Sequence, residues 1–137
     1  MKISNDVNSI ESSAISYMRS GRYALDFPGI DISHPWTGKS LNAAEGEFVD
    51  SYRNYGDVPG EIEMNLMYLI GSGLVSEKSG RWTLVSPELL GLQDGQYGIC
   101  VEMPDESMYV MNSLASNALR FKTGEYWFSL FLTANPD

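Results

Sequence analysis

The sequence has few of the residues on which cysteine and histidine chemistry depends. Among its 137 residues there is one cysteine, Cys100, and one histidine, His34. A single cysteine cannot form an internal disulfide, and a zinc site needs several cysteine or histidine ligands at short spacing. We therefore expect no disulfide, no metal centre and no bound cofactor, and we expect a reducing cytoplasmic location.

Positive charge is also scarce. Nine Lys and Arg residues stand against eighteen Asp and Glu residues, which gives a net charge of −9. Nucleic-acid binding depends on cations that contact phosphates, so this balance disfavours a nucleic-acid partner and favours a basic protein partner. An acidic composition that serves solubility alone is the alternative, and it stays open here.

Long hydrophobic runs are absent from the sequence as well. No apolar stretch approaches the roughly 20 residues that cross a bilayer, and the first residues, MKISNDVNSIESS, lack the apolar core of a secretory signal. Hydrophobic residues still make up 43% of the chain, which is ordinary for a protein that buries a core. We expect one cytoplasmic domain over residues 1–137, with no membrane segment.

The pattern of apolar residues predicts an α+β domain with a helical N-terminal half. Helical spacing indicates helices over 5–19, 41–55 and 61–72, and residues 22–27 have the pattern of a short strand. The segments 74–77 and 81–85 flank a Lys-Ser-Gly turn and predict a β-hairpin. Helix, strand, two helices and a hairpin is the element order of a winged-helix unit.

The second half predicts a β-α-β segment in a small antiparallel sheet. Residues 98–103 alternate like a strand, and residues 107–119 favour a helix. The segment 126–133, YWFSLFLT, has the strongest strand pattern. Because both of its faces are apolar, we place it at the centre of the sheet or in a homodimer interface. We also expect a helical turn over 87–92 and a tight turn at 94–95. The predicted core includes Leu66, Leu69, Ile70, Trp82, Trp127, Phe128 and Phe131.

No residue pattern predicts an active site. His34 with Asp31 or Asp26 is the best candidate for a general base, but a histidine packed in a loop explains it more simply. Residues 38–40 end like a phosphate-binding loop, yet Ser33 stands where that pattern needs its first glycine. We therefore expect the protein not to be an enzyme.

The helix predicted over 61–72 lacks the charges of a DNA-reading helix. No Lys or Arg occurs from residue 54 to residue 77, so we expect no nucleic-acid binding through it. Opposite its apolar stripe stand Glu61, Met64, Met67 and Tyr68. Methionine and tyrosine suit a protein contact. Packing of this face under the C-terminal segment is the alternative.

Acidic residues gather just before this helix and at its start. Between residues 41 and 63 six acidic residues stand against one basic residue, Arg53. If the two helices pack together, these carboxylates share a surface that could meet a basic protein. The predicted partner-binding residues are Glu45, Glu47, Asp50, Asp57, Glu61, Met64, Met67 and Tyr68.

These observations favour a small acidic, non-enzymatic protein-binding protein. The expected type is an inhibitor, such as an immunity protein, antitoxin or antagonist, that masks a basic partner of toxin, nuclease or effector kind. A winged-helix-like transcriptional regulator or adaptor is a first alternative. An acidic dimer of secretion-chaperone type is a second alternative, based on size and charge alone.

Overall fold

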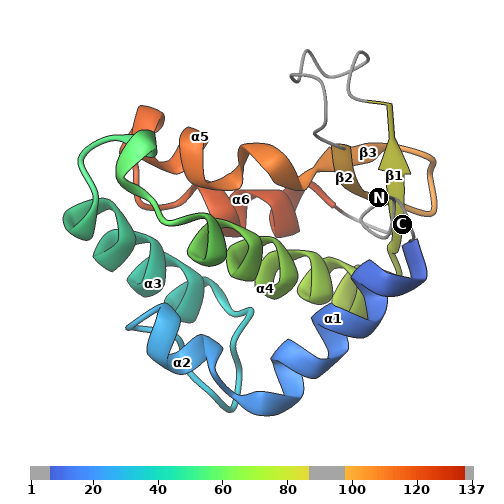
Figure 1. The fold of residues 1–137 in the computed structure, drawn as a ribbon, viewed down its shortest axis with the longest axis horizontal. Helices are drawn as coiled ribbons and strands as arrows, with labels where there is room; N and C mark the ends of the chain where they lie inside the picture. The colour runs from blue at the N-terminus through green and yellow to red at the C-terminus, as the bar shows by residue number, and fades with distance from the viewer. Residues whose placement is uncertain (1–6, 87–97, 135–137) are drawn as a thin grey trace.

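The structure, a computed structural model, describes residues 7–86 and 98–134 (Figure 1). Within these ranges it holds six α-helices and a three-stranded antiparallel sheet around one hydrophobic core. The predicted α+β class, with a helical first half and a small antiparallel sheet, is confirmed. The turns expected at 87–92 and 94–95 lie outside the described residues.

Within the described ranges, four helices come before the first strand and two follow the last one. The helices are α1 (Val7–Ser20), α2 (Tyr23–Asp26), α3 (Gly38–Ser51), α4 (Gly60–Lys78), α5 (Leu114–Phe121) and α6 (Tyr126–Thr133). The described residues also form the 3-10 turns η2 (Tyr55–Asp57) and η4 (Met111–Ser113). The strands are β1 (Arg81–Val85), β2 (Gly98–Glu102) and β3 (Met108–Val110), in the order β1-β2-β3. The register pairs Thr83 with Cys100 and Val101 with Tyr109.

Helix α4 runs through the middle of the molecule (Figure 1). It packs against α1, α2, α5 and α6 and against strands β1 and β2. Leu66, Leu69 and Ile70 are completely buried, as predicted for the core. Such a helix is apolar on more than one side because other elements cover most of it.

Two glycines inside α4 accept tryptophan rings rather than ending the helix. A Cβ atom at Gly71 would lie 2.0 Å from the Trp82 ring, and one at Gly73 would lie 2.5 Å from the Trp36 ring. Trp36 also donates its Nε1–H to the Leu69 carbonyl at 2.9 Å. The helix therefore continues to Lys78, and the hairpin predicted across 74–85 is wrong. Strand β1 pairs with β2 instead.

The strand predicted over 22–27 is also wrong, because this segment forms the helical turn α2. Tyr23 and Phe27 lie four residues apart and are both buried, as on one face of a helix. Helices α1 to α4 and a single strand thus replace the winged-helix order of the prediction. The start of α3 also shifts to Gly38, because the Thr37 hydroxyl accepts from the Ser40 amide at 3.2 Å.

The largest correction concerns residues 126–133, which form helix α6 rather than a strand. Its buried residues Trp127 and Phe131 are four apart, and Phe128 lies against Gly38. The described C-terminal part is therefore two strands followed by two helices, because β3 and α5 share the segment 107–119. A homodimer through a strand at 126–133 loses its basis.

Candidate functional site

Glu45, predicted to contact a partner, is instead a buried link between α3 and α6. Its side chain is completely buried, and its carboxylate accepts the amides of Tyr126 at 3.0 Å and Trp127 at 2.7 Å. The first amides of a helix have no partner within the helix, so a carboxylate is well placed there. We therefore remove Glu45 from the partner-binding set.

Burial and hydrogen bonding act on Glu45 in opposite directions. Burial raises the pKa of this carboxyl, the two amide bonds lower it, and the nearby Glu125 carboxylate raises it again. The net result is a pKa above the usual range of glutamate. Its role is structural, since it joins segments about 80 residues apart.

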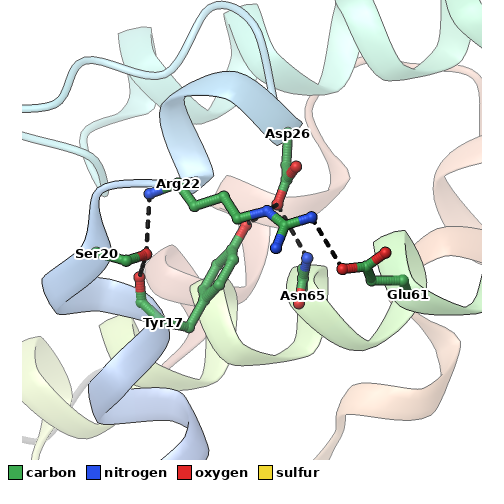
Figure 2. Close-up of polar contacts among 6 residues, drawn as sticks. All are labelled: Tyr17, Ser20, Arg22, Asp26, Glu61 and Asn65. Atoms are coloured by element: carbon green, nitrogen blue, oxygen red, sulfur yellow. Dashed lines mark hydrogen bonds and ion pairs between the residues drawn. The ribbon is translucent and has the colours of Figure 1, made fainter.

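A second set of polar side chains joins α1, α2 and α4 (Figure 2). We call it the polar junction: Tyr17, Ser20, Arg22, Asp26, Glu61 and Asn65. The Asp26 carboxylate accepts the Tyr17 hydroxyl at 2.7 Å and the Asn65 amide at 2.9 Å. Arg22 lies 3.6 Å from Asp26 and donates to Glu61 at 2.9 Å.

The polar junction explains the positions of Asn65 and of Glu61, which was predicted to stand on the outer face of its helix. Asn65 is buried because its amide binds Asp26, and Glu61, although exposed, already pairs with Arg22. Burial and the Asp26 carboxylate raise the pKa of Tyr17, which stays a protonated donor. Donors and acceptors are matched here, so the junction holds three helices together.

The remaining predicted residues of α4 are only partly accessible. Met67 is buried, while Met64 and Tyr68 are half-buried. Tyr68 borders a polar hollow of about 500 Å³ beside the serine-rich side of α1, and its ring centroid is 5.9 Å from that of Tyr17. Met67 is therefore also removed from the partner-binding set, because its side chain is buried within the domain.

Three predicted acidic residues do face solvent at the end of α3 and in η2. Glu47, Asp50 and Asp57, here called the acidic segment, are all exposed. Their carboxylates enter none of the ion pairs or hydrogen bonds within residues 7–86 and 98–134. Asp50 stands in the last turn of α3, where no basic residue accompanies it. Negative charge at a helix C-terminus is unfavourable, so this residue gains nothing from its own helix.

His34 lies on an exposed loop before α3. Its Nδ1 is 4.0 Å from the Asp31 carboxylate, which also accepts the backbone amides of Ser33 and His34. The ring borders a shallow hollow of about 340 Å³ together with Glu77. Asp26, the other suggested partner, belongs to the polar junction. The Asp31 carboxylate thus holds the loop in shape beside the ring.

Cys100 and the acidic side chains offer no reactive or metal-binding centre in the described ranges. Cys100 is buried in β2, and burial raises the pKa of its thiol to about 11, so the thiolate is not formed near neutral pH. No three His, Cys, Asp or Glu side chains come together to hold a metal ion among the residues that the structure describes. In the same ranges, no helix is long and apolar enough to cross a membrane.

The sequence analysis missed the polar junction, although a signal for it exists. Asn65 interrupts an otherwise apolar part of α4, and Tyr17 follows two apolar positions of α1 at helical spacing. A polar side chain on a buried face usually indicates a matching partner.

Comparison of the chain with protein-family models, curated proteins and solved structures finds no match.

Proposed function

We propose that this chain is a small, non-enzymatic protein that binds a basic surface of another protein and masks it, as inhibitors of immunity-protein or antitoxin type do. The acidic segment, Glu47, Asp50 and Asp57, makes the central contact. The observation that carries this proposal is that three exposed carboxylates have no bonding partner within the described chain.

The placement of these carboxylates supports binding more than stability. Asp50 opposes the dipole of α3, and a misplaced charge of this kind costs roughly 0.3–1 kcal/mol. A lysine or arginine of a partner would remove that cost. The net charge of −9 would also attract a basic partner over distance and increase the association rate at low salt.

The other predicted contacts take a lesser part in the proposed surface. Glu61 is exposed but shares its charge with Arg22, and Met64 and Tyr68 offer only part of their surface. We place these three at the margin of the contact. Glu45 and Met67 are buried and stay outside it.

The burial of α4 supports the expectation that this helix does not read DNA. A recognition helix must present side chains to base edges in the major groove. Eight residues of α4, from Asn65 to Leu74, are buried. The regulator alternative loses the hairpin of its winged-helix order, because residues 74–78 belong to α4 and strand β1 pairs with β2. The secretion-chaperone alternative still rests on size and charge alone.

A charge-reversal experiment tests the proposed surface. The variant Glu47→Lys/Asp50→Lys/Asp57→Lys is compared with Glu77→Lys/Glu106→Lys/Glu125→Lys, which changes three exposed acids elsewhere by the same total charge. Each is used as bait in lysate of its native cells, at about 50 mM and about 500 mM salt, because screening weakens exposed charge pairs.

We expect the wild type and the control variant to retain the same basic protein at low salt. The acidic-segment variant should lose it, and high salt should release it from all baits. If every captured protein binds both variants equally, or resists high salt, the proposal is wrong.

A further inference from the structure

A largely apolar hollow of about 290 Å³ lies beside α1. Its larger apolar lining residues are Ile15 and Met18 of α1, Trp36, Val75 of α4 and Trp82 of β1. Ile15 is 49% exposed, and two tryptophan side chains line the same hollow. Figure 1 shows α1 along the outer edge of the molecule. An exposed apolar patch of this kind often marks a protein contact.

The charges at the hollow identify what could cover it. Glu11, Ile15 and Arg19 lie four residues apart in sequence, so they follow one line along α1. Both charged residues are exposed, and neither has an ion pair in the part of the chain that is described. At 1.5 Å per residue they are about 12 Å apart along the helix, too far to pair with each other.

When two copies of this order of acid, apolar residue and base lie antiparallel, each acid stands opposite a base and the apolar residues meet. In an antiparallel copy of α1 centred on Ile15, Arg19 of one chain faces Glu11 of the other, and the second pair forms by symmetry. A two-fold axis produces this arrangement, because an isologous interface brings the same patch of both subunits together.

We propose that the chain forms a homodimer through α1, with the two α1 helices antiparallel about an axis near Ile15. Each Ile15 side chain enters the apolar hollow of the other copy. Two Glu11–Arg19 pairs close the ends of the interface. This surface lies on α1, whereas the acidic segment lies on α3 and η2, so either can fail without the other.

The test is the mass in solution, measured by sedimentation velocity from about 1 μM to about 1 mM, since a contact of one helix and its surroundings predicts affinity in the micromolar range. The single variants Glu11→Arg and Arg19→Glu each place like charges across the axis. Each should weaken dimerisation at least about 10-fold. The double variant Glu11→Arg/Arg19→Glu restores opposite pairs and should return to within about 3-fold of the wild type.

Two further variants complete the design. Ile15→Asp should give a folded monomer, as seen by circular dichroism, because this side chain is half exposed in one chain. Glu47→Arg, an equal charge change on α3, should leave the dimer unchanged. A wild type that stays monomeric throughout, a dimer that the single variants do not weaken, or a double variant no better than the single ones would overturn the proposal.

Discussion

At the scale of single residues, the first turn of α6 depends on one distant side chain. The amides of Tyr126 and Trp127 have Glu45 as their acceptor, and Trp127 is completely buried. A buried donor that loses its acceptor costs about 1–3 kcal/mol, because water cannot replace the missing bond. Glu45 therefore contributes more to stability than any exposed acidic residue nearby.

Glu45→Ala should lower the free energy of unfolding by about 3 kcal/mol, since two amides lose their acceptor. Glu45→Gln should lower the free energy of unfolding by less, because the glutamine carbonyl still accepts one amide while its NH2 group faces the other. Urea denaturation measures both. Glu47→Ala, two residues further along α3 and exposed, is the matched control and should change stability by less than about 0.5 kcal/mol. Equal effects at positions 45 and 47 would contradict this role.

The raised pKa of Glu45 also predicts a pH dependence. In the unfolded chain a glutamate has a pKa of roughly 4.3. In the folded protein the pKa of Glu45 is higher. At pH values between these two, the native state keeps a proton that the unfolded state has lost. The contribution of Glu45 to the free energy of unfolding is therefore fully present below this window and falls as the pH rises through it.

The stability of the wild type relative to Glu45→Gln isolates this effect, because glutamine does not titrate. Urea denaturation of both proteins from about pH 4 to about pH 8 should show the wild-type advantage shrinking as the pH rises. An advantage that grows over the same range would show that the folded state favours the ionised carboxylate instead.

At the scale of elements, Gly71 and Gly73 let two tryptophans lie directly on α4. Gly71→Ala and Gly73→Ala should each destabilise the protein by about 1–3 kcal/mol, because a methyl group would meet Trp82 or Trp36 at well under 3.0 Å. Gly46→Ala in α3 has no atom within 4 Å of the new methyl group and should stabilise by about 0.5–1 kcal/mol. Thermal denaturation of the three variants would reveal this opposite sign, and a stabilising change at 71 or 73 would contradict the packing.

Much of the element pattern could be predicted from local periodicity. The α+β class, most of α1, α3 and α4, and strands β1 and β2 all followed from it. The length of α4 did not follow, because glycine usually weakens a helix. The rings that require glycine at 71 and 73 come from Trp82 in β1 and from Trp36 in the loop before α3.

Helix α6 shows why the rest could not be predicted in the same way. Its eight residues are nearly all aromatic or apolar, so they fit a buried strand and a buried helix equally well. The Glu45 carboxylate that binds its first turn is 81 and 82 residues away in sequence. For Glu45 itself a local signal exists, because Leu41, Ala44 and Phe48 place position 45 beside the buried stripe of α3.

At the scale of the whole molecule, the structure divides the acidic residues by what they do. Glu45 supports α6, Glu61 pairs with Arg22, and Glu63 accepts the Tyr55 hydroxyl. Within the predicted cluster, the residues of the acidic segment are the ones whose exposed carboxylates have no bonding partner among the described residues. A basic partner protein is the proposal that gives these carboxylates a function.

Zero-length crosslinking in lysate of the native cells tests this proposal most directly. A carbodiimide joins carboxylates to lysines that already touch, and mass spectrometry then identifies both residues. We expect Glu47, Asp50 and Asp57 to be joined to lysines of one basic protein, with a yield that falls at high salt. Crosslinks that arise only from other acids, such as Glu77 or Glu106, or that leave the acidic segment unmodified by any partner, would contradict the account.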